Sequence, residues 1–370
     1  MIRRALVCLL PLALAACATQ APPAVPAAPA PMPPPTPPTQ PVPPPVSVKP
    51  APVGDLAIAR GDFARETAAK YGLDAATVET TLARAQIRDG IIAAMSRPAE
   101  GKPWRDYRPI FITPARIDGG RAFLATHRDA LARAEAKYGV PAELIVAIIG
   151  VETSYGGNKG SYPVVDALYT LGFRYPRTNE PAKVPRENAR EAFFRDELGQ
   201  MFALGREANM DIGALQGSYA GAMGWGQFMP SSYRQYAVDG DGDGKRDLIN
   251  DLDDVFPSIA NYFIGRGKWQ RGGPVMVRAM RDASAAEFNA ETIDPVHTLA
   301  ALAAKGYRPA QPVAPSELAT VIKLDGLNGP EYWMVFRNFQ AITKYNSSRL
   351  YATSVYQLSQ AIAGRDVPGA

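Results

Sequence analysis

Residues 140–155 read VPAELIVAIIGVETSY, and this stretch decides the fold that the sequence predicts. Pro141 stands where a helix tolerates proline, in its first turn, and the residues after it are apolar nearly all round, which is typical of a buried helix. Glu152 comes near the end of the stretch, where TSYGG follows it. We therefore expect a buried helix that carries a carboxyl group at its last turn.

The position of Glu152 predicts a raised pKa. Apolar surroundings disfavour the anion, and so does the negative end of the helix dipole. A carboxyl group that stays protonated near neutral pH can act as a general acid. A single glutamate more often caps a helix or pairs with an arginine, so the assignment needs support from other parts of the chain.

The first residues resemble a lipoprotein signal. A short basic start, MIRR, precedes an apolar run over 5–13 that is too short to span a bilayer, and LAAC at 14–17 resembles a bacterial lipobox. Cleavage there would remove residues 1–16 and leave Cys17 as a lipidated N-terminus. Ala18, rather than Asp, follows it, which favours the periplasmic face of the outer membrane. An ordinary cleaved secretory signal is the alternative.

Cysteines and prolines characterise the next segment. The chain has 2 cysteines, Cys8 and Cys17, so the domain that follows has no thiol for a disulfide, a metal or a nucleophile. Residues 17–54 are mostly Pro, Ala, Val and Thr, so we expect an extended tether of about 100 Å at most. Residues 55–370 are numerous enough to bury a core.

The remaining sequence predicts a mainly α fold of the α+β class. Helical spacing of apolar residues occurs over 55–71, 74–88, 121–138 and 347–363. Short β-rich segments, which predict a small sheet, occur at 274–278, 320–324 and 332–336. The net charge of +4 is scattered among acidic residues and gives no nucleic-acid signature, so we expect no nucleic-acid partner.

The chain lacks the patterns of several hydrolase classes. It has 2 histidines, His127 and His297, no Gly-x-Ser-x-Gly elbow and no His-x-x-x-His pair, so serine-triad and zinc mechanisms have little support. What remains is carboxylate chemistry with aromatic and amide side chains, which commonly bind sugars. The segment GSYAGAMGWGQFMPSS at 217–232 offers such residues among glycines that let a ligand approach the backbone. A tight helix crossing would need the same glycines.

Several motifs resemble the membrane-bound lytic murein transglycosylase B family. From about Trp104 to Leu358 they are, in order, GVETSYG, VVDALYTLGFRYPR, GSYAGAMGWGQFMPSSY, an acidic loop, NYF and KYNSSRLYATSVYQL. The resemblance implies a lysozyme-like core at about 104–265 and 338–370, a helical lobe at about 55–103 and a small β-containing lobe at about 266–337. It also implies cleavage of the β-1,4 bond between N-acetylmuramic acid and N-acetylglucosamine without water, which leaves 1,6-anhydro ends.

The resemblance implies that Glu152 acts alone, first as acid and then as base. It would protonate the glycosidic oxygen and then accept the proton of the muramoyl C6 hydroxyl. Most glycosidases use two carboxylates. Asp166 is the nearest candidate for a second one, and we interpret it as structural, because the resemblance implies that a group of the substrate serves instead.

The resemblance also places residues along a saccharide groove. These are Tyr107, Ser218, Met223, Gln227, Tyr262, Tyr345, Asn346 and Tyr351. Asn346 is expected to orient an acetamido group or the transition state, and Arg177 to meet the peptide stem or its carboxylates. Thr178 stands where the family often has a second arginine, and residues 179–190 look like an insertion.

An acidic loop, DGDGDGKRD at 239–247, resembles an EF-hand calcium loop. Hard oxygen ligands at positions one, three and five, Gly244 at six and a backbone carbonyl at seven suit Ca²⁺. Without the resemblance, a solvated acidic turn is an equal alternative. Asn250 at position twelve cannot close the site as a carboxylate would, and in this family a later residue does so. The predicted ligands are Asp239, Asp241, Asp243, Lys245 and Asp253, with Asp251 and Asp254 as alternatives to the last.

The sequence thus predicts a lipid-anchored lytic transglycosylase that acts on peptidoglycan strands, with a structural calcium ion and no catalytic cofactor. Cell-wall synthesis or hydrolysis enzymes are candidate partners. Two alternatives remain: a hydrolytic muramidase, and a non-catalytic lipoprotein that binds murein and tethers it to the membrane.

Overall fold

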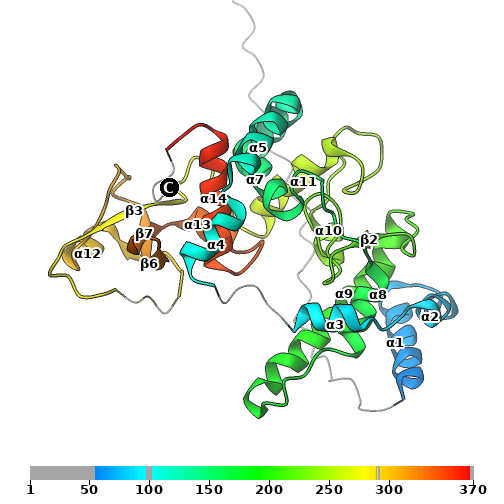
Figure 1. The fold of residues 1–370 in the computed structure, drawn as a ribbon. Helices are drawn as coiled ribbons and strands as arrows, with labels where there is room; N and C mark the ends of the chain where they lie inside the picture. The colour runs from blue at the N-terminus through cyan, green and yellow to red at the C-terminus, as the bar shows by residue number, and fades with distance from the viewer. Residues whose placement is uncertain (1–54, 97–101, 289, 291, 367–370) are drawn as a thin grey trace, which may run out of the picture. The chain divides into compact units, whose positions relative to one another are not determined.

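The computed structural model describes residues 55–96, 102–288, 290 and 292–366. The predicted signal at 1–16, Cys17 and the proline-rich segment up to residue 54 lie outside this part of the chain. The described residues form a mainly helical structure with a five-stranded and a two-stranded sheet (Figure 1). None of their helices is long and apolar enough to cross a membrane.

The predicted buried helix is confirmed as α7 (Ala142–Thr153). Every residue from Leu144 to Gly150 is buried. Four helices pack around it: α5 (Pro114–Thr126), α6 (Arg128–Tyr138), α11 (Leu252–Gly265) and α14 (Arg349–Ile362). Because neighbouring helices surround α7, the residues at its last turn have a fixed environment.

The chain before α7 differs from the prediction of one helix over 121–138. The structure has two helices, α5 and α6, separated at His127, where φ is −109° and ψ is 23°. The His127 ring packs against Phe123 and Phe256, with ring centroids 4.5 and 5.7 Å away. Tertiary packing therefore accompanies this bend, which occurs without Gly or Pro. Gly139 ends α6 in the left-handed conformation.

Three helices begin the described chain: α1 (Leu56–Tyr71), α2 (Ala75–Arg84) and α3 (Asp89–Met95). Asp55 and Asp74 accept hydrogen bonds from the first amides of α1 and α2. α2 ends before the predicted Arg88, because Ala85 has extended backbone angles. α3 packs against α8 (Val164–Phe173), which follows the central helix in the chain.

A long helix, α9 (Val184–Glu207), occupies a region to which the sequence analysis assigned no element. Its first turns and a preceding 3₁₀ turn, η2 (Pro181–Lys183), come from the segment 179–190. α9 packs against α8 and α10 (Pro230–Tyr236). The segment that looks like an insertion is thus partly the start of a packed helix.

The five-stranded sheet is antiparallel, in the order β4-β6-β7-β3-β5. Its strands are β3 (Met276–Arg281), β4 (His297–Thr298), β5 (Tyr307–Pro309), β6 (Leu318–Gly326) and β7 (Gly329–Val335). The three predicted strands are confirmed as β3, β6 and β7, although the predicted 274–278 begins before β3 and the predicted 332–336 ends one residue after β7. A second apolar core forms between this sheet and α12 (Leu299–Ala304), and α13 (Arg337–Ile342) leads from β7 towards α14.

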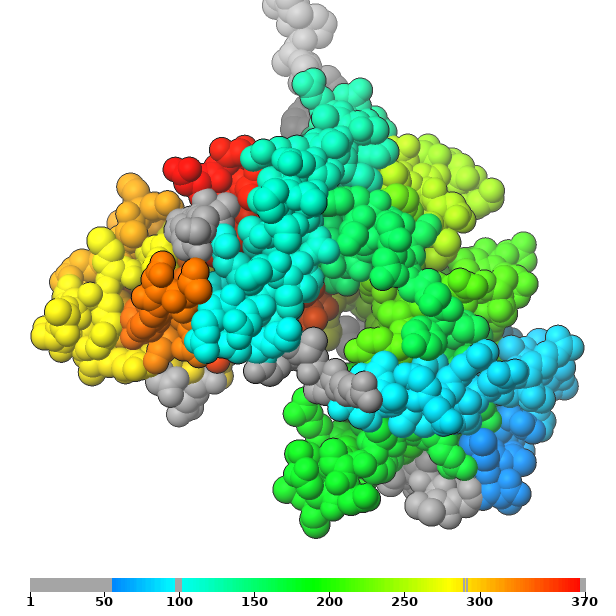
Figure 2. All heavy atoms as spheres, in the orientation of Figure 1, coloured from blue at the N-terminus to red at the C-terminus, as the bar shows by residue number. Residues whose placement is uncertain are grey.

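Two further contacts join segments that lie far apart in the sequence. β1 (Tyr162–Pro163) pairs with β2 (Gln216–Gly217), which joins the chain after α7 to the start of the glycine-rich segment. α4 (Trp104–Phe111) packs against α14. In Figure 2 the residues of α4 and α5, in cyan and teal, form part of the visible surface, although Trp104 and Tyr107 are buried.

Candidate active site

Glu152 lies half-buried in the last turn of α7, with its carboxyl group against α14. Tyr351 Oη donates a hydrogen bond of 2.5 Å to Glu152 Oε1. Burial raises the pKa of Glu152 to about 7, and the hydrogen bond from Tyr351 acts against this rise because it favours the carboxylate. The expected rise in pKa is confirmed, so this group titrates near neutral pH.

The start of α14 holds Tyr351 in place. Ser348 Oγ accepts from Tyr351 N at 3.4 Å, and Asn346 Oδ1 accepts from Ser348 N at 3.0 Å. Burial, together with the charge of Glu152, raises the pKa of both Tyr351 and Tyr345 well above the ordinary value. Tyr351 therefore stays a donor near neutral pH, and the Asn346 side chain helps to fix the helix start.

The glycine-rich segment 217–229 forms a folded loop between β2 and α10. Met223 and Phe228 exchange backbone hydrogen bonds of 3.0 and 2.9 Å. Gln227, at φ 50°, donates from Nε2 to the carbonyls of Gly224 (3.0 Å) and Lys159 (3.2 Å). Among the described residues none donates to Gln227 Oε1, so this oxygen can accept from a ligand.

Aromatic rings join this loop to the helices beside it. Tyr345 Oη donates to the Gly226 carbonyl at 2.6 Å, and Tyr262 Oη donates to the Lys344 carbonyl at 2.5 Å. The rings of Tyr262 and Tyr345 meet edge to face, with centroids 4.9 Å apart. Burial raises the pKa of Tyr262 to about 12. These two predicted residues are therefore brought together.

Three other predicted residues make contacts within the protein, and two of them, Met223 and Tyr107, are buried. Met223 is fully buried. Ser218 Oγ accepts from the amides of Ala220 (3.3 Å) and Ala222 (3.1 Å), which shapes the loop. Tyr107 is 6% exposed and packs against Phe111, at 5.2 Å between ring centroids. The structure thus assigns each of them a packing or turn contact beside the predicted ligand contact.

Arg177 is engaged by α9. Its guanidinium pairs with Glu191 at 2.6 Å and donates to Asn188 Oδ1 at 2.9 Å. Thr178, which stands where an arginine is common in the family, donates to Glu187 Oε1 from N (2.9 Å) and Oγ1 (2.6 Å). The 179–190 segment therefore supplies hydrogen-bond acceptors to Arg177 and Thr178.

Asp166 has the contacts of a structural residue. Its carboxylate, which is buried, accepts from Gln86 N at 2.9 Å and from the Arg88 Nε and Nη2 at 2.8 and 2.6 Å. These bonds hold the chain before α3 against α8. Both oxygens are occupied, which supports the structural interpretation.

The acidic loop brings together three carboxylates. Oxygens of Asp239, Asp241 and Asp254 lie within 4.8 Å of one another. Asp254 is 1% exposed, and burial raises its pKa. Within the described residues no cationic side chain pairs with it, so a bound cation would compensate a buried charge.

The predicted closing ligand, Asp253, has a different partner in this structure. Asp253 pairs with Arg133 of α6 at 2.7 Å, whereas the alternative, Asp254, accepts from Gly240 N and Asp247 N, at 2.6 Å each. Asp243 accepts from Lys245 N at 2.7 Å. The structure therefore favours Asp254 over Asp253 as the carboxylate that closes the loop, because the two project from adjacent positions of α11 in different directions.

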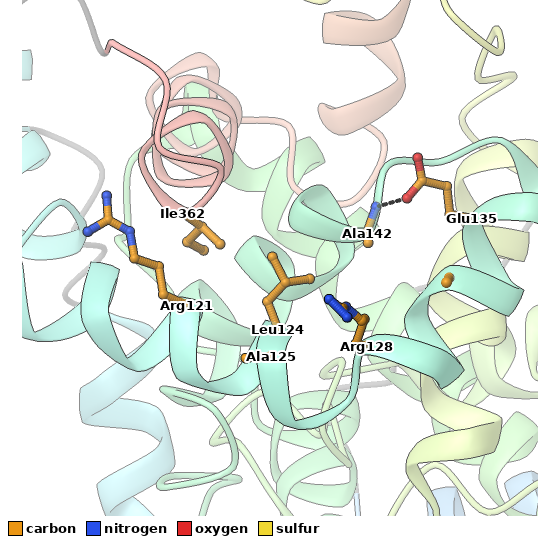
Figure 3. Close-up of a pocket in the computed structure, with 8 residues that line it drawn as sticks. Arg121, Leu124, Ala125, Arg128, Glu135, Ala142 and Ile362 are labelled. Carbon is orange, nitrogen blue, oxygen red and sulfur yellow. Dashed lines mark hydrogen bonds between the residues drawn. The ribbon is translucent and has the colours of Figure 1, made fainter.

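The first turn of α7 lies about 15 Å from Glu152 by helix rise. There Glu135 Oε2 accepts from Ala142 N at 3.0 Å (Figure 3). These residues border an open pocket of about 400 Å³ between α5, α6 and the end of α14, flanked by Arg121 and Arg128. The contact fixes the start of the helix that carries Glu152 at its end.

Sequence reasoning missed a second glutamate whose pKa is strongly raised by burial. Glu197 of α9 is 3% exposed and accepts from Ser231 N (2.9 Å) and Oγ (2.6 Å) at the start of α10. Burial raises its pKa to about 7. Pro230-Ser231 indicates a helix start, but nothing in the sequence indicates an acid 34 residues earlier as its partner.

A helical core whose central helix ends in a carboxyl group with a pKa of about 7, beside a tyrosine-lined loop, fits the class of glycan-cleaving enzymes with a lysozyme-like fold. Residues 58–360 match the Transglycosylase SLT domain family, SLT_2, and the chain belongs to that family. The match spans almost all of the described residues.

A curated relative is similar over most of its length. It is membrane-bound lytic murein transglycosylase B of Escherichia coli strain K12, 39% identical over 322 residues, which cover 82% of this chain and 84% of the relative. The chain is therefore a peptidoglycan lytic transglycosylase, and the predicted family and enzyme class are confirmed.

Three solved structures have the same fold. Soluble lytic transglycosylase SltB1 of Pseudomonas aeruginosa has a TM-score of 0.74 at 43% identity, covering 82% of this chain and 98% of its own. E. coli Slt35 in complex with calcium has a TM-score of 0.71 at 39% identity, covering 82% of this chain and 91% of its own. P. aeruginosa SltB3 in complex with NAG-anhNAM-pentapeptide has a TM-score of 0.72 at 30% identity, covering 86% of this chain and 82% of its own. The predicted fold class, a mainly helical α+β lysozyme-like protein, is confirmed.

Proposed function

We propose that Glu152 is the single catalytic acid and base in non-hydrolytic cleavage of the β-1,4 bond between N-acetylmuramic acid and N-acetylglucosamine. The observation that carries this proposal is a half-buried carboxyl group with a pKa of about 7 and one phenolic donor, Tyr351. Near neutral pH such a group exists in both forms, so it can give a proton in one step and take one in the next.

The proton balance closes without water. Protonated Glu152 gives its proton to the glycosidic oxygen as the bond from that oxygen to C1 of the muramic acid breaks. The resulting carboxylate accepts the proton of the C6 hydroxyl as O6 bonds to C1, which forms the 1,6-anhydro ring and restores the acid. Tyr351 Oη stabilises the carboxylate between these two steps.

The absence of a nearby second carboxylate favours this reaction over hydrolysis. Most hydrolytic glycosidases need a second carboxylate as a base or nucleophile. Among the described residues no carboxylate contributes to the pKa of Glu152, and Asp166 is fully engaged by Arg88 and Gln86. A substrate hydroxyl is therefore the better candidate for the attacking group.

The predicted groove residues are proposed as the saccharide site. Gln227 Oε1 is free to accept from a sugar hydroxyl or acetamido N–H, while Tyr262 and Tyr345 support the loop that carries it. The likeness to SltB3, whose structure holds NAG-anhNAM-pentapeptide, supports a glycan with a peptide stem as ligand. The remaining proposed contacts are Tyr107, Arg177, Ser218, Met223, Asn346 and Tyr351.

The test is mass spectrometry of muropeptides released from purified sacculi by the wild type, Glu152→Gln and Glu197→Gln. The two glutamates have the same raised pKa, but Glu197 is buried against Ser231. We expect anhydro products from the wild type and Glu197→Gln, and none from Glu152→Gln. Products that end in reducing muramic acid would show that the protein is a hydrolytic muramidase. Cleavage by Glu152→Gln would refute the assignment of Glu152 as the acid. If the wild type bound sacculi without cleaving them, the protein would be a tether.

We further propose that the acidic loop holds a structural Ca²⁺. Asp239, Asp241 and Asp254 offer hard carboxylate oxygens, and the likeness to Slt35, whose structure holds calcium, supports the same ion. Addition of Ca²⁺ after chelation should raise the melting temperature of the wild type and not of Asp239→Asn. Asp211→Asn is the matched control, because Asp211 also accepts from a backbone amide in an exposed turn. An equal rise in all three proteins would show that the ion binds elsewhere.

The proposed location is the periplasmic face of the outer membrane, with a lipid on Cys17. The LAAC pattern supports it, as does the membrane-bound description of the E. coli relative. Cys17→Ser should move the full-length protein from the membrane to the soluble fraction. Soluble wild type would favour the ordinary secretory signal.

A further inference from the structure

The chain turns sharply after Glu152 in an unusual backbone conformation. Ser154, Tyr155 and Gly156 have φ of 50°, 59° and 84°. The first two are not glycines, and side chains disfavour this left-handed region. The turn is closed by hydrogen bonds from Ser154 N to the Gly150 carbonyl (3.2 Å) and from Tyr155 N to the Ile149 carbonyl (3.3 Å). Side-chain contacts must hold such a conformation in place.

The ring of Tyr155 lies against a glycine cradle formed by Gly119, Gly120 and Gly150. A methyl group on Gly120 would lie 2.5 Å from Tyr155 Oη, and one on Gly150 would lie 2.6 Å from the same atom. A methyl group on Gly119 would lie 3.1 Å from Tyr155 Cε2. Two helices, α5 and α7, thus leave space for one ring, and the Phe123 ring of α5 stacks on it at 5.6 Å between centroids.

Hydrogen bonds lock the ring and the turn to α5. Tyr155 Oη donates to the Arg116 carbonyl at 2.7 Å, and Arg116 Nη2 donates to Ser154 Oγ at 3.1 Å. Arg116 Nη1 also donates to the Ile110 carbonyl at 2.8 Å, at the end of α4. The turn after Glu152 is therefore tied to α4 and α5.

The same turn supports the glycine-rich loop. Gly156 N donates to Thr153 Oγ1 at 3.2 Å, and this hydroxyl lies 3.2 Å from the Trp225 carbonyl. The indole ring of Trp225 covers Gly156, where a methyl group would lie 2.3 Å from it. Trp225 is two residues before Gln227, so the end of α7 and the proposed ligand loop share these contacts.

We propose that Tyr155 is a positioning residue for Glu152: its ring in the glycine cradle fixes the end of α7, so that the carboxyl group stays turned to Tyr351 and shielded from water. The inference rests on the proposed function of Glu152. Tyr155 acts through the backbone of the last turn, three residues from the acid.

Within the part of the chain that the structure describes, four titratable groups act on Glu152, Tyr351 or Tyr155 as follows. Tyr351 donates to Glu152, Tyr345 interacts with its charge from the segment before α14, and Tyr107 of α4 interacts with Tyr351. Arg116 is the cation that acts on Tyr155. Since none of the groups that act on Glu152 is a cation, loss of shielding would lower its pKa chiefly through hydration.

The test uses two variants that perturb the ring differently. Tyr155→Phe keeps the ring and removes the bond to the Arg116 carbonyl. Gly119→Ala pushes the ring by a few tenths of an ångström, while alanine favours the helix and protects the fold. For both we measure kcat and KM on soluble glycan chains against pH, together with melting temperature.

We expect kcat to fall about tenfold in Tyr155→Phe with little change in KM. The basic limb of its pH profile should move down by about 0.5 unit or more, because the acid must be protonated. Gly119→Ala should shift the limb in the same direction without a fall in melting temperature.

The matched control is Tyr307→Phe. Tyr307 is fully buried in strand β5 of the five-stranded sheet, and its Oη donates to the Ala286 carbonyl at 3.0 Å. We expect this variant to lose stability and to keep the wild-type pH profile. An unchanged pH profile in both Tyr155→Phe and Gly119→Ala would overturn the inference. If Glu152→Gln retains activity in the same assay, the proposed function fails instead.

Discussion

Replacement of Glu152 by glutamine is expected to stabilise the folded protein in alkali and to change its stability little in acid. Burial raises the pKa of Glu152 from 4.5 to about 7. Unfolding returns the carboxyl group to water and to its ordinary pKa. The native state is therefore destabilised wherever it must hold the anion, whereas glutamine has nearly the same shape and no charge.

The magnitude follows from the two pKa values. The difference between about 7 and 4.5, at about 1.36 kcal/mol per pKa unit, amounts to about 3 kcal/mol. Below pH 4.5 the group is protonated in both states, and the stability of the wild type is intact. As pH rises from 4.5 through 7 the unfolded chain releases its proton first, so this stability is lost. About 3 kcal/mol is the upper value, because Glu152 is only half-buried.

The assay is urea unfolding of the wild type, Glu152→Gln and Glu197→Gln at pH 4.5 and pH 9. The free energy of unfolding of Glu152→Gln, relative to that of the wild type, should increase by up to about 3 kcal/mol from pH 4.5 to pH 9. Glu197→Gln should show a similar pH-dependent gain, offset at both pH values by about 1 kcal/mol for weakened bonds to Ser231. A constant gap for Glu152→Gln would mean that its pKa is ordinary and would refute the reasoning.

Two further substitutions test the surroundings of the acid. Tyr351→Phe removes the donor that favours the carboxylate, so the pKa of Glu152 should rise above about 7 and the basic limb of the pH profile of kcat should move to higher pH. We also expect kcat to fall roughly tenfold, which is the effect of losing one hydrogen bond. A shift of the basic limb to lower pH would contradict this assignment. Asp166→Asn should lower the free energy of unfolding in urea by about 2 kcal/mol, because the ion pair with Arg88 is lost. The activity of the folded enzyme should stay unchanged. If the variant were stable but inactive, Asp166 would be a second catalytic carboxylate.

The sequence predicted the central helix because burial on all sides leaves an unbroken apolar run. It predicted the raised pKa of Glu152 because the run ends there, and a local argument about burial was enough. The bend at His127 could not be predicted in this way, since it accompanies ring packing with Phe256, far along the chain. The start of α9 was missed for a related reason: its polar residues bond to Arg177 and Thr178, which no periodicity reveals.

The partners of the site came from the resemblance rather than from spacing. Tyr351 lies 199 residues after Glu152, and only the order of motifs connected them. Tyr155 and its glycine cradle were missed, although GVETSYG contains both Gly150 and Tyr155. The remaining glycines lie on α5, and their fit to the ring depends on how the two helices cross.

The acidic loop shows where counting residues stops being informative. Asp253 and Asp254 are adjacent in the first turn of α11, so they differ by about 100° around its axis. Linear spacing cannot decide which of them faces the loop. The answer depends on Arg133 of α6, which pairs with Asp253 and leaves Asp254 beside Asp239 and Asp241.

Two glutamates with the same raised pKa separate that property from a catalytic role. Glu152 and Glu197 both titrate at about 7, and in both cases burial is the main cause. Glu197 accepts two hydrogen bonds from Ser231 and is 3% exposed, so its carboxyl group is enclosed by protein. Glu152 accepts one bond, from Tyr351, and keeps part of its surface open. A group that must exchange a proton with a substrate needs both features, burial enough to retain the proton at neutral pH and an open edge through which to transfer it.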